Sequence, residues 1–368
     1  MLDLVVVALG AAVTAARWWD VDPARRFAPL LVRAQALVPL VGPVALVVLV
    51  RDLVVGAGGP AAAAAALLGV HAALALPGWW APSPDEGGAP SRPDAPEEVG
   101  PQEGRPRGGV RGRVPGRVRV AAVNTWYGRA DAAATAALVR RLDPDVLALV
   151  ELPPAALPDL ERAGVGAALP HRAGRAADDG VGTLVLARWP LEEVTDDQLG
   201  CLPARGSAAP PVGAERTSDN PLVRLRPPGA QPLLVLAVHP FYPALADVGP
   251  WRRQLRSLER WAREQAARQP AAPFVVLGDL NATADHPALR RLLAPRGPLV
   301  LAARRLGGGR PRTWPDVGPG SAVLALDHVL AHGLRVRAGG AAHLRGTDHR
   351  AVWADLEPLP LPLPGPRS

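Results

Sequence analysis

Six short apolar runs in the C-terminal two thirds of the sequence each meet a polar residue that is able to do chemistry. The polar residue is asparagine, a carboxylate or histidine, and it stands at one end of the run. A strand buries its body in a sheet and presents its end residue at the rim. The sequence therefore predicts sheets whose rim gathers polar side chains. The runs are 118–123, 146–150, 233–238, 274–277, 323–326 and 351–356.

The residues at the ends of these runs are the candidates for a functional site. In chain order they are Asn124, Glu151, His239, Asp279 with Asn281, Asp327, and Asp348 with His349. Asp279 and Asn281 are two positions apart, so on an extended segment both side chains point to the same face. An Asx-turn after a strand is the alternative interpretation of this pair.

Two segments between the runs have the spacing of amphipathic helices. Segment 130–142 places Leu138, Val139 and Leu142 on one face. Segment 250–268 carries large apolar residues at spacings of three and four. Those residues are Trp251, Leu255, Leu258 and Trp261. Strand-like runs mixed with helices favour two packed sheets covered by helices.

The composition changes twice along the 368 residues. Residues 1–80 are almost entirely apolar, residues 81–116 are rich in Pro, Gly and charge, and residues 117–357 alternate like a globular domain. A Pro-rich tail, 358–368, follows. We therefore predict a transmembrane anchor, a disordered linker, a catalytic domain and a tail.

Three apolar stretches make up the N-terminal region, at about 4–16, 34–50 and 53–76. A helix needs about 20 apolar residues to cross the hydrocarbon core, and about 17 can suffice. The second and third stretches meet this requirement, and the first is short. Because more apolar sequence follows the first stretch, an uncleaved multi-pass anchor in the lipid bilayer is favoured over a signal peptide. A buried helical domain is the alternative.

The positions of arginine make a prediction about topology. Four arginines lie between the first two stretches, namely Arg17, Arg25, Arg26 and Arg33, and Arg51 lies between the second and third. The positive-inside rule places the first of these loops in the cytoplasm. With three spans, the catalytic domain would then be cytoplasmic as well.

The net charge of +7 suits a phosphate-bearing partner or anionic lipid. Much of the excess lies in the linker, so the charge alone does not predict nucleic-acid binding. Cys201 is the only cysteine, which excludes an intramolecular disulfide and a cysteine-based zinc site. Any metal must therefore be held by oxygen and imidazole ligands.

The ordered set of motifs resembles the endonuclease/exonuclease/phosphatase (DNase I-like) superfamily. The motifs are Asn124, Glu151 closing residues 143–151, Gly278-Asp279-Leu280-Asn281, Leu326-Asp327-His328 and Asp348-His349, with residues 182–191 similar to an inner strand and its turn. The resemblance implies an α/β (α+β) four-layer sandwich of two packed mixed β-sheets flanked by helices. About three transmembrane helices are expected before it. This arrangement resembles membrane-bound actinobacterial members whose domain faces outward, so we expect an extracytoplasmic domain, against the arginine count.

The resemblance also implies roles for the metal ligands and the substrate contacts. Glu151 matches the principal ligand of Mg²⁺ or Mn²⁺, a hard cation that prefers oxygen donors. Asn124 is expected to be the second ligand. Asp348 is also expected to reach the metal. Tyr127 and Arg129 are expected to touch the substrate.

The remaining residues are expected to act on the reacting groups. Asp279 would orient or deprotonate the attacking water, and Asn281 would hold that water or a phosphoryl oxygen. His349, fixed by Asp327, would act as general base or, when protonated, stabilise the transition state. His239 would donate to the scissile phosphate. Whether His349 or Asp279 is the general base stays open.

We predict a membrane-anchored, metal-dependent phosphoesterase that cleaves a phosphodiester, phosphomonoester or pyrophosphate bond. Lipid-linked substrates are considered because an anchored domain meets lipid head groups at high local concentration. A nuclease of the same fold is the first alternative. The Pro/Ala/Ser-rich segment 207–219 offers few residues for groove contact, so nucleic acid is not favoured. A non-catalytic membrane receptor for a phosphorylated ligand is the alternative of another class.

Overall fold

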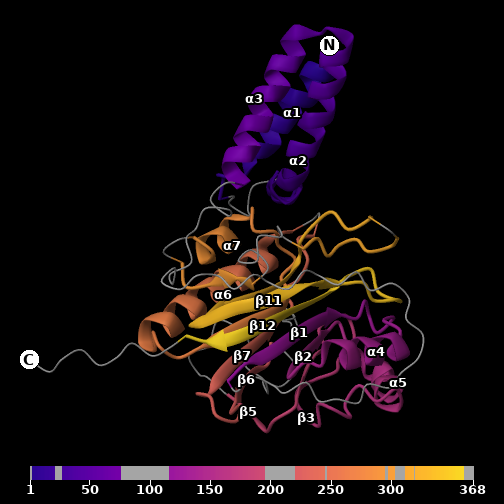
Figure 1. Cartoon of the computed structure of the whole chain (residues 1–368), viewed down its shortest axis with the longest axis vertical. Helices are drawn as coiled ribbons and strands as arrows, with labels where there is room; N and C mark the ends of the chain where they lie inside the picture. Colours follow the sequence, from indigo (N-terminus) through magenta and orange to yellow (C-terminus); the bar gives the residue numbers. More distant parts are fainter. Residues whose placement is uncertain are drawn as a thin grey trace, which may run out of the picture.

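The structure is a computed structural model of the chain and describes residues 2–20, 27–75, 116–194, 220–244, 247–294, 297–302, 311–318 and 320–359. The described residues form an N-terminal bundle of helices that stands on one end of a domain built around two sheets (Figure 1). The linker prediction for 81–115, the tail from 360, segment 207–219, Cys201, Arg25 and Arg26 lie outside the described residues.

Two six-stranded mixed sheets make up the core of the domain as far as it is described. The first sheet has the strand order β11-β12-β1-β2-β4-β3. Its strands are β1 Val118–Asn124, β2 Val146–Val150, β3 His171–Arg175, β4 Thr183–Ala187, β11 Leu334–Ala342 and β12 Ala351–Pro358. The second sheet has the order β5-β6-β7-β8-β10-β9. Its strands are β5 Leu191–Glu193, β6 Leu222–Leu225, β7 Leu233–Val238, β8 Phe274–Asp279, β9 Val300–Leu301 and β10 Asp327–His332.

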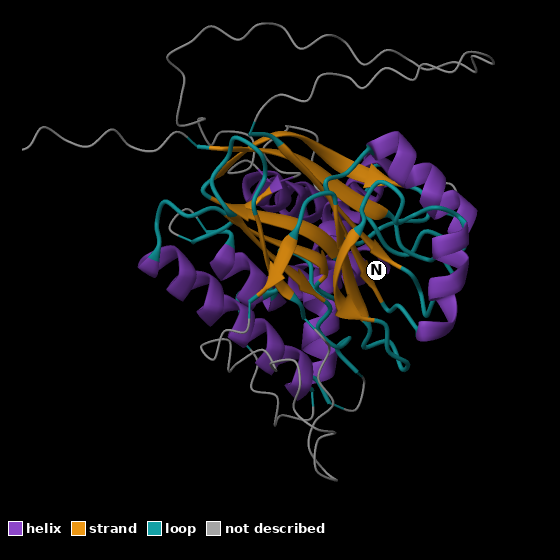
Figure 2. Ribbon diagram, turned by 90° about the horizontal axis from the view of Figure 1, so that it is seen from below, coloured by secondary structure: helices purple, strands orange, loops and turns teal. Residues whose placement is uncertain are grey.

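Helices cover the outer face of each sheet, so the domain has four layers (Figure 2). On the first sheet these are α4 Ala132–Leu142, η2 Pro154–Ala156 and α5 Leu157–Arg162, and on the second they are α6 Gly249–Arg268 and α7 Pro287–Leu292. One apolar core lies between the sheets, and one lies under the helices on each outer face. The predicted DNase I-like sandwich is therefore confirmed.

The helices form where local sequence and packing agree. Asp131 accepts a hydrogen bond from Ala134 N at 2.7 Å and so caps the first turn of α4. The predicted apolar faces of α4 and α6 are buried. Burial of each large apolar side chain contributes about 1.5 to 3 kcal/mol, which fixes both helices on their sheets.

One predicted strand is absent from the described structure. Residues 323–326 make only an isolated bridge, between Leu324 and Trp314, and the strand itself begins at Asp327. Asp327 is therefore the first residue of β10 rather than the residue after a strand. The apolar run 323–326 instead leads the chain to the rim, where Leu324 and Leu326 line a cavity.

The N-terminal region folds into α1 Leu2–Ala16, α2 Ala28–Val55 and α3 Gly58–Ala75. Of the described helices, α2 alone is long and apolar enough to cross a membrane, and α1 and α3 are shorter apolar helices. The predicted second span, about 34–50, lies within α2. Helix α2 also contains Arg33 at one end and Arg51 at the other, so neither arginine lies in a loop.

The base of the bundle is docked on the domain. Ala28 and Val32 of α2 belong to the same apolar core as α6, α7 and the second sheet. Arg17, which follows α1, pairs with Asp285 at 2.6 Å. The C-terminal end of α1 and the N-terminal end of α2 therefore face the two-sheet domain.

Candidate active site

The central parallel strands of both sheets end at the same rim. Strands β1 and β2 pair in parallel in the first sheet, and β7 and β8 pair in parallel in the second. Their C-terminal ends deliver Asn124, Glu151, His239 and Asp279. Asn124 joins the two sheets, because its Nδ2 donates to Glu151 Oε1 at 2.9 Å and to Asp279 Oδ2 at 3.0 Å. Its Oδ1 accepts from Trp126 N at 2.8 Å.

Left-handed backbone directs two of the rim side chains. Glu151 has a φ of 53° and Asn281 has a φ of 49°. Such a conformation costs a non-glycine residue about 1 kcal/mol or more, and it persists only where the surrounding structure imposes it. Asn281 N donates to Asp279 Oδ1 at 2.7 Å, and its Nδ2 donates to Pro240 O at 3.0 Å. These turns fix the directions in which Glu151 and Asn281 project.

A second group reaches Asp279 from the antiparallel strands. Asp327 pairs with Asp279 across β10 and β8, and His349 stands just before β12. His349 Nδ1 lies 2.8 Å from Asp327 Oδ2, and its Nε2 lies 3.8 Å from Asp279 Oδ2. All three side chains are buried. Asp327 therefore orients the imidazole so that Nε2 faces Asp279.

The surroundings of His349 make its imidazole strongly basic. Burial is the largest influence on its pKa and lowers it, but the charges of Asp327 and Asp279 and the hydrogen bond to Asp327 raise the pKa to about 10. The two carboxylates therefore favour the protonated ring. In that form Nε2 donates a proton rather than accepting one.

His239 approaches the same carboxylates from the second sheet. Its Nδ1 lies 3.1 Å from Gly180 O, and its Nε2 lies 3.3 Å from Glu151 Oε1 and 3.8 Å from Asp279 Oδ2. Burial lowers the pKa of His239, but contact with Glu151 and the charge of Asp279 outweigh it, so the pKa is raised. Burial raises the pKa of Glu151, and the contacts with His239 and Asn124 bring it below its ordinary value.

Two buried carboxylates face each other at the centre. Burial and the charge of Asp327 raise the pKa of Asp279, although both imidazoles act against this. Burial also acts to raise the pKa of Asp327, but the charge and hydrogen bond of His349 lower it. Asp279 is therefore the carboxylate of this pair whose negative charge the protein compensates less.

The donor atoms at the rim fit a divalent cation. Two groups have ligand atoms within 4.8 Å of one another, one of Glu151, His239 and Asp279 and one of Asp279, Asp327 and His349. Glu151 Oε2 and Asp348 Oδ1 are buried, and neither has a hydrogen-bond partner among the described residues. Buried carboxylate oxygens are costly without a partner, and Mg²⁺ or Mn²⁺ takes such ligands.

Asp348 is positioned by a tryptophan from the segment that precedes β10. Trp314 donates from Nε1 to Asp348 Oδ2 at 3.0 Å, which leaves Oδ1 as the free oxygen. Both residues line a cavity of about 360 Å³ together with Glu151, Asp279, Asn281 and His349. Of the other predicted residues, Asn124, His239 and Asp327 do not line this cavity, and they contact the carboxylates and the imidazole that do.

Of the two predicted substrate contacts, Tyr127 and Arg129, only Tyr127 lines the cavity. Tyr127 lines the cavity and is half exposed. Arg129 is not among the residues that line it, and its guanidinium lies over the Trp126 ring at 4.5 Å from the ring centroid. The substrate contact of Arg129 stays a prediction. His328 and His332 bond to backbone carbonyls, as expected of structural histidines.

The family model described as Endonuclease/Exonuclease/phosphatase family matches residues 121–349. The chain belongs to this family. The match begins in β1 and ends at His349, so it contains every rim residue described above. The bundle of α1, α2 and α3 lies outside the matched residues. No curated protein matches the chain.

Solved structures with the family's fold are similar to the chain at low identity. An endonuclease/exonuclease/phosphatase from Beutenbergia cavernae DSM 12333 is 20% identical over 67% of this chain and 73% of that one, with a TM-score of 0.48. Truncated TDP2 from Caenorhabditis elegans is 16% identical over 66% and 98%, with a TM-score of 0.47. TDP2 from D. rerio, complexed with single strand DNA product, is 14% identical over 66% and 99%, with a TM-score of 0.48.

Proposed function

We propose that this protein is a metal-dependent phosphoesterase that uses Mg²⁺ or Mn²⁺ to hydrolyse a phosphodiester, phosphomonoester or pyrophosphate bond. The observation that carries the proposal is the convergence of strand ends from both sheets on one cavity, with carboxylate oxygens that lack protein partners. Glu151 and Asp348 would hold the cation, with Asn124 beside them. When bound, the cation supplies charge neutralisation at the phosphoryl oxygens and lowers the pKa of a ligated water.

The residues around the cation divide the remaining tasks. Asp279 Oδ2 faces both imidazoles at 3.8 Å, so it is placed to orient water and to take its proton. His349, with a pKa raised to about 10, would donate to a phosphoryl oxygen as an imidazolium. His239 would donate from Nε2 on the other side, and Asn281 would hold the water. This division favours Asp279 over His349 as general base.

We also propose that the protein is an integral membrane protein with its domain outside the cytoplasm and that its substrate is linked to a lipid. Helix α2 supports membrane insertion by length and composition. The arginine count that favours the cytoplasm is weakened, because Arg17 pairs with Asp285 and Arg33 lines the cavity. An alkaline phosphatase reporter fused after Ser368 is active only outside the cytoplasm. Activity of a cytoplasmic reporter instead would reverse the orientation.

The activity is tested with the full chain in nanodiscs. Wild type should hydrolyse a chromogenic phosphodiester or release phosphate from a prenyl pyrophosphate with Mg²⁺ or Mn²⁺, and EDTA should stop it. Glu151→Ala and His349→Ala should each lower kcat by about 100-fold or more. Glu357→Ala, at the exposed ion pair with Arg337 near the C-terminal end of β12, is the matched control and should keep full activity.

Equal turnover by wild type and both rim variants would refute a role of this rim in catalysis. Faster metal-dependent cleavage of single-stranded DNA than of lipid phosphates would identify a nuclease instead. Binding of a phosphorylated ligand without turnover of any phosphoester would identify a receptor.

A further inference from the structure

One wall of the active-site cavity comes from outside the family's matched region. Val32, Arg33 and Ala36 of α2 line the same cavity as Glu151 and His349. The family match begins at residue 121, so the sandwich alone does not supply this wall. The cavity is a composite of the N-terminal bundle and the catalytic domain.

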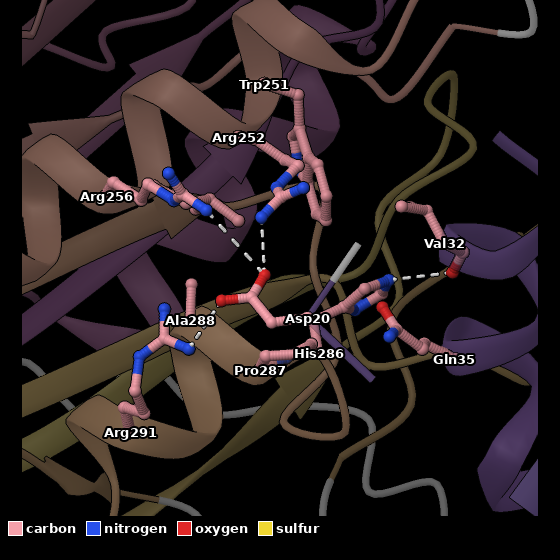
Figure 3. Close-up of a pocket in the computed structure, with 11 residues that line it drawn as sticks. Asp20, Val32, Gln35, Trp251, Arg252, Arg256, His286, Pro287, Ala288 and Arg291 are labelled. Carbon is pink, nitrogen blue, oxygen red and sulfur yellow. Dashed lines mark hydrogen bonds and ion pairs between the residues drawn. The ribbon is translucent and has the colours of Figure 1, made fainter. Parts of the chain in front are cut away.

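Helix α2 is held against the cavity by a closely packed interface. His286 Nε2 lies 3.1 Å from Val32 O, and Val32 is buried in the core under α6 and α7. Beside this contact, Asp20 pairs with Arg252 at 2.5 Å and with Arg291 at 3.1 Å (Figure 3). The space left there is about 20 Å³, room for about one water molecule.

Arg33 carries a buried donor into this wall. Its Nη1 is buried and has no hydrogen-bond partner among the described residues. Of the described residues that line the cavity, Arg33 is the only arginine, and it shares the lining with three carboxylates, those of Glu151, Asp279 and Asp348. A buried donor without an acceptor is unfavourable, which makes an anionic oxygen a strong partner for it.

The chemistry of the lining identifies the class of ligand. A guanidinium binds phosphate through directed, charge-assisted hydrogen bonds, and the rim opposite offers carboxylates for a cation on which a phosphate also binds. Ala36 and Leu324 add apolar surface to the same lining, and Val32 is buried behind it. An ester with a phosphate at one end and an apolar group next to it matches both kinds of surface.

We infer that Arg33 of α2 binds a phosphoryl oxygen of the substrate in the catalytic cavity and selects phosphate esters of apolar alcohols, with the apolar group against Ala36 and Leu324. This inference rests on the proposed phosphoesterase function and adds a substrate-binding residue from the anchor to it. The bundle is then part of the active site as well as an attachment to the bilayer.

The test compares Arg33→Gln, Arg33→Lys and wild type in the full chain in nanodiscs. With a long-chain alkyl phosphate ester as substrate, Arg33→Gln should raise KM by about 10-fold to 100-fold while kcat changes by less than about 3-fold. Arg33→Lys should recover part of the loss, because it keeps the charge without the planar geometry. Arg51→Gln, at the other end of the same helix, is the control and should behave as wild type.

A binding measurement separates this inference from the proposed function. Dodecylphosphonate and methylphosphonate are not hydrolysed, and calorimetry with Mg²⁺ measures their affinity whether or not the protein turns over an ester. Arg33→Gln should weaken both by about 10-fold or more, and wild type should prefer the dodecyl compound. Equal affinities of wild type and Arg33→Gln would overturn the role of Arg33, even if Glu151→Ala abolishes hydrolysis. Unchanged thermal unfolding of Arg33→Gln is required to exclude a displaced helix.

Discussion

Two charged clusters lie near the base of α2, and they are built in opposite ways. At the interface of bundle and domain, the carboxylate of Asp20 faces Arg252, Arg256 and Arg291, and little space is left (Figure 3). At the rim, several carboxylates crowd around two imidazoles, buried oxygens lack protein partners, and a cavity of about 360 Å³ opens beside them.

The difference distinguishes a structural interface from a ligand-binding site. At the interface a carboxylate stands among guanidinium groups and little space is left, so the cluster stabilises the packing of two parts. Where the protein leaves like charges together and polar atoms unpaired, the fold loses stability that only a ligand can restore. The comparison predicts opposite effects when one negative charge is removed from each cluster.

The largest effect is expected at the rim. Asp279→Asn should lower kcat/KM by about 1000-fold, because it removes the group that faces both imidazoles. Burial and the charge of Asp327 raise the pKa of Asp279, so its ionised form is unfavourable in the folded protein above the ordinary carboxyl pKa. In EDTA at pH 7 the free energy of unfolding should therefore fall by less than about 1 kcal/mol or rise. Calorimetric melts measure this, and a loss of several kcal/mol would contradict the comparison.

A smaller effect of opposite kind is expected at the interface. Asp20→Asn should lower the free energy of unfolding by about 1 to 2 kcal/mol, since three guanidinium groups lose their shared counter-charge. Hydrolysis of a small soluble diester should stay within about 3-fold of wild type, because Asp20 does not line the catalytic cavity. Asp159→Asn, in an exposed pair with Arg162, is the control and should change stability by less than about 0.5 kcal/mol. If Asp20→Asn and Asp159→Asn had equal free energies of unfolding, the Asp20 cluster would have no stabilising role at the interface.

The smallest effect concerns an exposed ion pair far from both clusters. Hydrogen bonds from Arg337 and Arg117 lower the pKa of Glu357 to about 2. A lowered carboxyl pKa stabilises the fold above the ordinary pKa of about 4.5, and this stabilisation is lost as the pH falls towards 2. Glu357→Gln should therefore lower the free energy of unfolding by less than about 1 kcal/mol at pH 6 and by nothing measurable near pH 2. A constant difference across this range would mean that the charge is not the cause.

Local patterns predicted the parts of the domain that depend on local alternation. The runs 146–150 and 233–238 coincide with β2 and β7, and the apolar face of 250–268 is the buried face of α6. The rim followed from strand ends, because parallel strands carry their C-terminal residues to one edge. The strand predicted at residues 323–326 was wrong, because an apolar run that lines a cavity has the same sequence pattern as a short buried strand.

The contacts that complete the site join distant segments and leave no local signal. Trp314 orients Asp348 although the two residues are 34 positions apart, and the sequence around either residue does not predict this contact. Arg33 was interpreted as a loop charge that reports membrane topology, whereas the structure places it in a helix and in the cavity lining. A pattern of spacings identifies which face of an element is buried, but not which element will cover it.

The hydrogen bond between His286 and Val32 spans 254 positions of the chain. Helix α2 is synthesised before the domain, whereas the surface that it rests on includes β10, which is synthesised much later. Contacts of such separation form late, because long loops must close first. The cavity wall that α2 supplies therefore forms late in folding. A nascent chain whose sandwich is incomplete does not yet have a complete active-site cavity.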